Sequence, residues 1–128
     1  MAKKNPTASA PHKPTALVTG ASSGIGEALA HCFAAGGFDL VLVARSADKL
    51  KTLAANLTQK HGVGVRVLPA DLAQPGAAAQ LRAALSGKDH QVDVLVNCAG
   101  VLEQGAFTGI TAAGHQQIID LNISGLTA

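Results

Sequence analysis

The sequence contains no tyrosine and no tryptophan, and its only aromatic residues of the Phe, Trp and Tyr type are three phenylalanines. Proteins that bind nucleic acids commonly combine a strongly basic surface with aromatic side chains on which bases stack. Here the net charge is only +2, and the basic residues are scattered along the chain. The composition therefore argues against a nucleic-acid-binding protein.

Cysteine is scarce as well, since the chain has only Cys32 and Cys98 and no CxxC motif. Both cysteines lie in apolar segments, which predicts buried thiols in an intracellular, cytoplasmic protein. The five histidines are far apart and lack the spacing of metal ligands. We therefore expect no metal site and no redox-active disulfide.

Long hydrophobic runs are missing, and no apolar segment has the length needed to span a bilayer. Residues 1–14, MAKKNPTASAPHKP, are polar, basic and proline-bearing, without the apolar core of a secretory signal. This composition predicts a disordered basic tail. A transit peptide is the alternative, because the segment lacks acidic residues, although it also lacks arginine.

The rest of the chain, residues 15–128, alternates between two hydrophobic patterns. Short apolar runs rich in β-branched residues predict strands at 15–20, 38–45, 63–70 and 92–100. Between and after them, apolar residues recur at helical spacing. The first helix would bury a stripe of Ile25, Leu29, Cys32, Phe33 and Gly36. The others would use Leu50, Leu53, Ala54 and Leu57; then Ala78, Leu81 and Leu85, after an opening Pro75; and finally Ile118, Leu121, Asn122 and Gly125. This alternation predicts an α/β fold, a Rossmann-like doubly wound parallel sheet that includes about four strands.

Three glycines stand in the first strand-to-helix connection, within LVTGASSGIGEAL. In such a connection the free N–H groups and the positive end of the helix dipole attract phosphate. Gly20 would allow the sharp exit from the strand, Gly24 the approach of phosphates, and Gly26 the close packing of the helix on the sheet. Two neighbouring hydroxyl groups would add hydrogen-bond donors, at Ser22 and Ser23. The pattern favours a dinucleotide over a simple turn, and it lacks the Gly-Lys-Ser/Thr ending of an ATP-binding phosphate loop.

The second strand ends in VARS, so that Arg45 and Ser46 stand where an NAD-binding protein would carry an acid for the ribose 2′-hydroxyl. A carboxylate would repel the 2′-phosphate of NADP, whereas a guanidinium binds it through hydrogen bonds worth about 1.5–3 kcal/mol. The sequence therefore predicts NADP in preference to NAD. The alternative is that Arg45 is only a solvated charge at the end of a strand.

Four motifs in this order resemble the short-chain dehydrogenase/reductase family: TGASSGIG (19–26), ADL (70–72), NCAG (97–100) and LN (121–122). The resemblance extends from about residue 15 to residue 128 and implies a partial NAD(P)-binding Rossmann domain. It implies that the cofactor's diphosphate is lined by Gly20, Ser22, Gly24, Ile25 and Gly26.

The resemblance further implies the surroundings of the adenosine. Arg45, beside Ser46, would take the 2′-phosphate, and Asp71 would accept the exocyclic amine of adenine, which Leu72 would border. The sheet beside the adenosine would be stabilised by Asn97, Ala99 and Gly100. Asn122 matches the asparagine that holds a water in the family's proton relay to the catalytic lysine.

The chain departs from the family pattern in two respects. Cys98 stands where the family usually has a second asparagine. The family's catalytic tyrosine, and the lysine four residues after it, lie beyond the asparagine helix, but this sequence has no tyrosine and its last lysine is Lys88. We therefore expect the N-terminal half of an NADP-dependent oxidoreductase, inactive by itself. The alternative is a non-catalytic nucleotide-binding module or an inactive remnant.

The resemblance also implies the assembly and substrate of the complete enzyme. It would be a homo-oligomer that acts on a small carbonyl or alcohol, with no nucleic-acid or membrane partner. Sheet order 3-2-1-4 would leave the fourth strand as an open edge. The last helix would present apolar side chains for which these residues offer little cover: Ile118, Ile119, Leu121 and Ile123.

Overall fold

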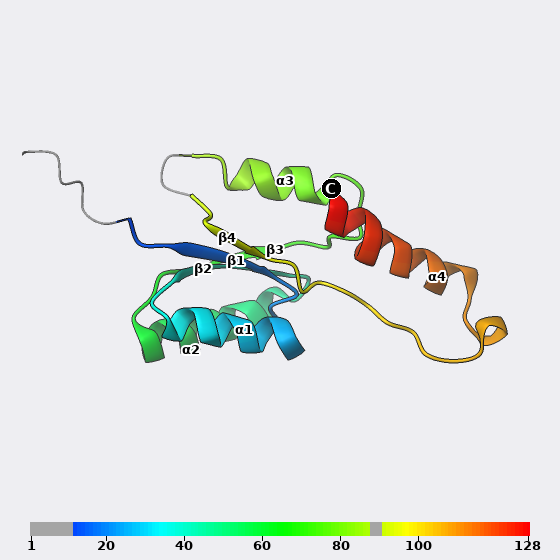
Figure 1. Ribbon diagram of the computed structural model, residues 1–128, viewed down its shortest axis with the longest axis horizontal. Coiled ribbons are helices and arrows are strands. Elements are labelled where there is room, and N and C mark those ends of the chain that lie inside the picture. The colour runs from blue at the N-terminus through cyan, green and yellow to red at the C-terminus, as the bar shows by residue number, and fades with distance from the viewer. Residues whose placement is uncertain (1–11, 88–90) are drawn as a thin grey trace, which may run out of the picture.

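The computed structural model describes residues 12–87 and 91–128. Residues 1–11, which are most of the predicted basic tail, fall outside the described residues. Residues 88–90, which include Lys88 and His90, also fall outside them. The elements alternate as predicted (Figure 1). They are β1 (Thr15–Thr19), α1 (Gly24–Ala35), β2 (Asp39–Ala44), α2 (Ala47–His61), β3 (Val65–Pro69), α3 (Ala77–Ala84), β4 (Val94–Val96), the 3-10 turn η1 (Phe107–Gly109), α4 (Ala112–Ile119) and the π-helical segment η2 (Asp120–Gly125).

The four strands form one parallel sheet in the order β3-β2-β1-β4, which confirms the predicted topology. In the central pairing Leu17 of β1 lies opposite Val41 of β2, and on its other side opposite Leu95 of β4. Within the described residues β4 is therefore an edge strand, also as predicted. The carboxyl ends of β1, β2 and β4 meet at one side of the sheet, where open α/β sheets bind ligands.

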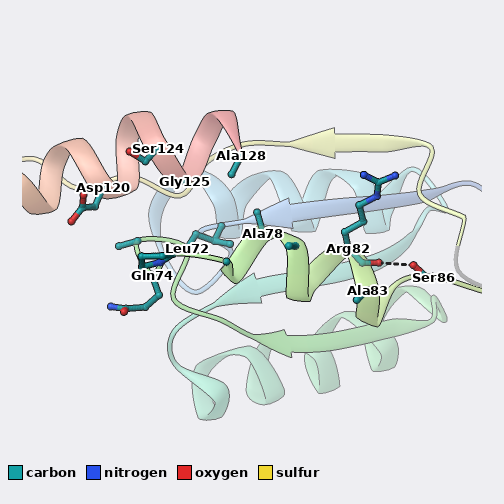
Figure 2. A pocket seen from close by; sticks show the side chains of 14 residues that line it. Leu72, Gln74, Ala78, Arg82, Ala83, Ser86, Asp120, Ser124, Gly125 and Ala128 are labelled. Carbon is teal, nitrogen blue, oxygen red and sulfur yellow. Dashed lines mark hydrogen bonds between the residues drawn. The ribbon is translucent and has the colours of Figure 1, made fainter.

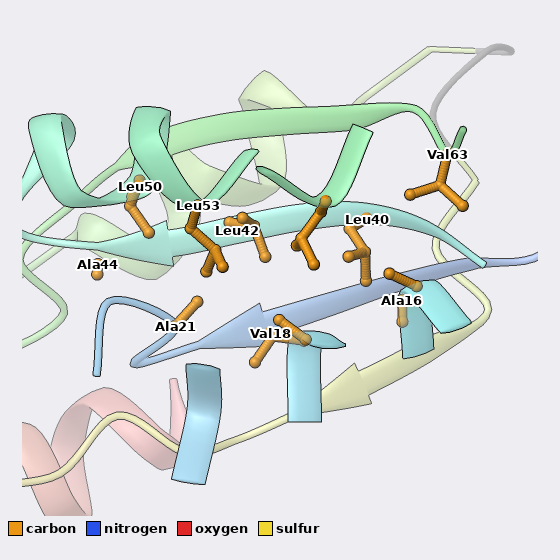
Figure 3. Packing of buried hydrophobic residues seen from close by; sticks show 12 residues of the cluster. Ala16, Val18, Ala21, Leu40, Leu42, Ala44, Leu50, Leu53 and Val63 are labelled. Carbon is orange, nitrogen blue, oxygen red and sulfur yellow. The ribbon is translucent and has the colours of Figure 1, made fainter. Parts of the chain in front are cut away.

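Helices cover both faces of the sheet: α1 and α2 lie on one, and α3 with α4 and η2 on the other (Figure 1). The α1–α2 face holds the larger core, in which Val18, Leu42 and Leu50 are fully buried (Figure 3). Each such side chain contributes about 1.5–3 kcal/mol on burial. The opposite face is less covered, as the 60% exposure of Leu95 there indicates.

The buried face of α1 differs from the predicted stripe. Gly26, Ala30 and Ala34 face the core, and Phe33 of the predicted stripe packs against it partly buried, whereas Ile25 is 74% exposed and Cys32 is exposed. The prediction of a buried Cys32 thiol was therefore wrong, and Cys98 is only half-buried. The physical reason is close packing, because a helix that lies near a sheet meets it with its smallest side chains rather than its largest.

Several boundaries also differ from those predicted. Strand β4 has three residues rather than the nine of 92–100. Helix α3 begins at Ala77, after Gly76 in the left-handed conformation, so that Pro75 precedes the helix rather than opening it. The last helix is not α-helical throughout, because it changes to π-helix at Asp120. Among the described residues no helix is both long and apolar enough to cross a membrane.

Candidate nucleotide-binding cleft

A cleft of about 720 Å³ opens at the carboxyl ends of β1, β2 and β4. Its volume lies within the usual range of ligand-binding sites, about 300–1,000 Å³. Most of the residues singled out in the sequence line it: Gly20, Ser22, Ser23, Gly24, Ile25, Gly26, Arg45, Ser46, Asp71, Leu72, Ala99 and Gly100. Asn97 and Asn122 do not. The fold thus brings the glycine loop and the segments that follow β2, β3 and β4 to one place.

The three glycines of the loop stand where a side chain would collide or would require an unfavourable backbone conformation. Gly20 has a φ of +64°, and a Cβ there would lie 2.6 Å from the Cys98 carbonyl oxygen. Gly24 has a φ of +57° with open space around it, which leaves the backbone accessible from the cleft. A Cβ on Gly26 would collide with the carbonyl oxygen of Gly20. Gly26 therefore allows the helix to close on its own loop, as well as to pack near the sheet.

The amino end of α1 faces this loop with uncommitted polar groups. Ser23 is the N-cap residue and has extended backbone, but its side chain makes no capping hydrogen bond. Its hydroxyl, like the first N–H groups of the helix, therefore remains free to bind an anion. Ile25 follows at the mouth of the cleft, and its 74% exposure fits a residue that contacts a ligand rather than the core.

Two cationic side chains lie near the start of α2, one in the connection from β2 and one in the first turn of the helix. Arg45 is exposed at the end of β2, and Ser46 caps α2 by accepting a hydrogen bond from the Lys49 backbone N–H at 3.4 Å. Lys49 also lines the cleft. The sequence analysis missed Lys49, because no motif marks it and only the fold brings it to the cleft.

Asp71 and Leu72, after β3, form a third part of the cleft. The two carboxylate oxygens of Asp71 accept hydrogen bonds from the Ala73 N–H at 3.1 Å and from the Gln74 side-chain amide at 3.4 Å. These bonds fix the carboxylate in its turn. Each carboxylate oxygen has a second lone pair, so the group can still accept a proton donor from a ligand.

Thr19, the first residue of the TGASSGIG motif, has a role that the sequence analysis did not predict: it joins the end of β1 to the segment after β4. Its buried hydroxyl oxygen accepts hydrogen bonds from the backbone N–H groups of Cys98 and Ala99, both at 3.1 Å. The hydroxyl also lies 3.4 Å from the Val96 carbonyl, to which it donates. The glycine loop and the segment after β4 are thereby held together. Asn97 lies on the other side, in a hollow that Leu95 and other residues line.

Asn122 lies in η2, where the helix is π-helical, a feature found frequently at functional sites. Its side chain bonds to both backbone groups of Val101: the carbonyl oxygen accepts from the Val101 N–H at 2.9 Å, and the amide donates to the Val101 carbonyl at 2.7 Å. Val101 itself lines the cleft. Asn122 therefore acts on the cleft through the position of this loop.

A second cavity of about 760 Å³ lies between α3 and η2 (Figure 2). Small side chains such as Ala78 and Ala83 line much of it, and its charged residues Arg82 and Asp120 lie at opposite ends. The hydrogen bond drawn there runs from the Ser86 hydroxyl to the Arg82 backbone. Without converging polar groups this groove is a weaker candidate than the cleft at the glycine loop. Among the described residues no group of three potential metal ligands occurs.

Comparison with known proteins matches residues 14–128 to the family model of the short chain dehydrogenases. A 7beta-hydroxysteroid dehydrogenase of Collinsella aerofaciens is 35% identical over 107 residues, which are 84% of this chain and 40% of that protein. An uncharacterized oxidoreductase of Staphylococcus haemolyticus is 36% identical, over 87% of this chain and 47% of that protein. The chain thus spans less than half the length of these curated relatives.

Solved structures give the same result. A short-chain dehydrogenase from Sphingobium yanoikuyae in complex with NADPH is 46% identical, with a TM-score of 0.82, over 89% of this chain and 44% of that one. An alcohol dehydrogenase from the archaeon Thermococcus sibiricus, complexed with 5-hydroxy-NADP, is 32% identical, with a TM-score of 0.84, over 89% and 48%.

Proposed function

Because this chain belongs to the short-chain dehydrogenase family, we propose that it forms the adenosine-binding half of an NADP-dependent oxidoreductase. The whole protein would transfer hydride between this cofactor and a small carbonyl or alcohol substrate. One observation carries the proposal: the cleft combines a glycine loop at a helix N-terminus with Arg45, and no acid, at the end of β2. Two of its structural relatives hold NADPH or an NADP derivative.

The diphosphate would lie against the glycine loop. Gly24 leaves room for it, and the Ser23 hydroxyl and the first N–H groups of α1 would donate hydrogen bonds to its oxygens. Ser22 and Ile25 would contact it from the two sides of the loop. These residues already line the cleft, which lowers the entropic cost of binding.

The adenosine would be bound by residues from three connections. Arg45 and Ser46 would take the 2′-phosphate, and the Asp71 carboxylate would accept the adenine amine, with Leu72 against the ring. Their positions around one cleft support this assignment. The sheet on the adenosine side would be stabilised by Asn97, Ala99 and Gly100.

NADPH, when bound, supplies the hydride. These 128 residues contain no tyrosine, so the general acid of the family's reaction is not among them. Asn122 would contribute to the proton relay, and we propose that it does so by positioning the loop at Val101. By themselves the 128 residues would bind nucleotide without turnover.

We also propose that the whole protein is cytoplasmic and homo-oligomeric. Two free cysteines support a reducing compartment. Ile119 and Ile123, which are 43% and 57% exposed on the last helix, support a subunit interface there. Size-exclusion chromatography with light scattering would test it, because Ile123→Glu should then shift the whole protein toward monomer.

Calorimetry with two probes, adenosine 2′,5′-bisphosphate and 5′-AMP, tests the cofactor proposal. We expect the bisphosphate to bind more tightly, and Arg45→Asp to weaken its binding by about tenfold or more while changing that of AMP little. Arg82→Asp is the matched control, because it makes the same change of charge in the other cavity. Equal losses for both probes would reduce Arg45 to a surface charge.

The alternative function, a non-catalytic nucleotide-binding module, is favoured by the missing tyrosine alone. Spectrophotometric measurement of NADPH consumption with a panel of ketones and aldehydes separates the two. Turnover by the whole protein, with none by the 128 residues, is the result expected from our proposal. NADPH binding by a whole protein that turns over none of them would favour the alternative.

A further inference from the structure

We propose that Gly125 is a positioning residue for the adenine of the cofactor, because it sets where the turn with Asp71 and Leu72 lies. The inference deepens the proposed function and rests on it. Leu72 lines the nucleotide cleft and Gly125 does not, so Gly125 would act on a ligand through its contact with Leu72.

Gly125 and Leu72 meet where the last helical segment crosses the turn after β3. Gly125 is the last residue of η2, and both residues line the second cavity (Figure 2). A Cβ on Gly125 would collide with the Leu72 carbonyl oxygen and would lie 3.2 Å from the carbonyl carbon. Gly125 does not have a positive φ, so this close approach, rather than backbone conformation, is the reason for glycine here.

The turn after β3 is bonded within itself and would move as a unit. The Asp71 carboxylate accepts from the Ala73 N–H at 3.1 Å and from the Gln74 side-chain amide at 3.4 Å. The Asp71 carbonyl also accepts from the Gln74 N–H at 3.1 Å. A displacement of the Leu72 carbonyl would therefore carry the Asp71 carboxylate with it.

The helical segment is fastened more firmly than the turn that it touches. Three residues before Gly125, the Asn122 side chain makes two hydrogen bonds to Val101, at 2.9 Å and 2.7 Å. Close-packed interiors transmit strain rather than absorb it. We therefore expect a methyl group at position 125 to displace the turn, and with it the Asp71 carboxylate, while η2 stays in place.

The position of the Asp71 carboxylate can be measured through the base that it binds. The exocyclic amine of adenine donates a hydrogen bond, for which an ionised carboxylate is an acceptor. Purine riboside 5′-monophosphate is 5′-AMP without this amine. The ratio of the two affinities therefore reports the contact between Asp71 and the amine, and it does not depend on a 2′-phosphate.

Calorimetry on the whole protein with these two probes tests the inference. We expect the native protein to bind 5′-AMP about tenfold more tightly than the analogue, and Gly125→Ala to reduce this ratio to about threefold or less. Gly109→Ala is the matched control, because a Cβ there meets nothing within 4 Å and Gly109 has no positive φ. Partial unfolding lowers both apparent affinities by the same factor and leaves the ratio unchanged.

The outcomes separate this inference from the proposed function. If the native protein prefers 5′-AMP and Gly125→Ala keeps the full preference, the role of Gly125 is overturned while the proposed function stands. The same holds if Gly125→Ala binds neither probe even in sucrose, which favours the folded state, because glycine would then serve the fold alone. If the native protein binds both probes equally, the assignment of Asp71 to adenine and this inference fail together. An equal fall of the ratio in Gly109→Ala would also overturn the inference.

Discussion

Asn122 and Val101 bind each other twice, because the Asn122 side chain accepts from the Val101 N–H at 2.9 Å and donates to the Val101 carbonyl at 2.7 Å. A carboxamide can do both at once, because it carries an acceptor oxygen and a donor nitrogen side by side. The pair fastens the loop after β4 to the π-helical turn, so that the shape of one cleft wall depends on a residue outside it.

Substitution of Asn122 should loosen this loop in a graded way. Asn122→Asp, when ionised, keeps the acceptor and loses the donor, whereas Asn122→Leu loses both and leaves part-buried backbone groups of Val101 without partners, at about 1–3 kcal/mol. Hydrogen exchange of the Val101 amide measures the effect. The exchange rate should rise from the native residue through Asp to Leu, and equal rates would show that the two bonds do not hold the loop.

Thr19→Val should destabilise the chain although it preserves shape. The valine removes the acceptor for the N–H groups of Cys98 and Ala99, and we expect a loss of about 1–3 kcal/mol in the free energy of unfolding. Urea denaturation is the measurement. Thr19→Ser keeps the hydroxyl and should retain most of the stability, whereas similar losses for both variants would point to packing of the methyl group instead.

Gly20→Ala and Gly62→Ala separate two costs at positive φ. Gly62 has a φ of +66° and open space around it. Gly62→Ala should therefore lower the free energy of unfolding only by the conformational penalty of about 1–2 kcal/mol. Gly20→Ala adds a clash with the Cys98 carbonyl oxygen, for which overpacking costs about 1–3 kcal/mol more. Denaturation midpoints compare the variants. Equal denaturation midpoints for the two variants would mean that the segment around Cys98 moves away from the added methyl group without cost.

The pKa of Asp93 lies below its ordinary value of 3.8, chiefly because the Thr15 backbone N–H donates to the carboxylate, with the His12 side-chain hydrogen bond second. A carboxyl group with a lowered pKa stabilises the fold above its ordinary pKa, and this contribution is lost as the pH falls through the lowered value. Asp93→Asn should therefore be less stable than the native chain at neutral pH.

Denaturation over a pH series measures this difference, which should narrow as the pH falls below 3.8. Gln91→Ala is a useful control, because Gln91 makes a weaker bond to the same carboxylate and should have a smaller effect. A gap between native chain and Asp93→Asn that is independent of pH would exclude the carboxylate charge as its cause.

The parts of the fold that depend on local pattern were predictable from sequence. Strand β2 and helix α2 differ from their predicted positions by little, because a continuous apolar run and a regular Leu50, Leu53, Leu57 stripe leave few alternatives. The sheet order was predicted as well, because 3-2-1-4 is the order of the first four strands in a Rossmann-like fold. Most cleft residues could be predicted from the sequence, because the backbone conformations at Gly20 and Gly24 require glycine and so mark the loop.

Features that depend on distance between elements were not predictable. Ile25 and Cys32 were placed in the core because they are hydrophobic, but close contact between α1 and the sheet selected Gly26, Ala30 and Ala34 instead. Thr19 is the first residue of the TGASSGIG motif, but its role as an acceptor was not predicted, because that role exists only where β4 ends beside β1. The π-helical turn at Asn122 was not predicted from the sequence either.

The sequence by itself determined the succession of strands and helices, the glycine loop and the family, because these depend on residue type and on spacing along the chain. Only the tertiary structure decided which face of α1 is buried, that Asn122 holds Val101, and that Lys49 joins Arg45 at the cleft. The physical reason is that such contacts join residues through space, and packing of whole elements sets which side chains meet.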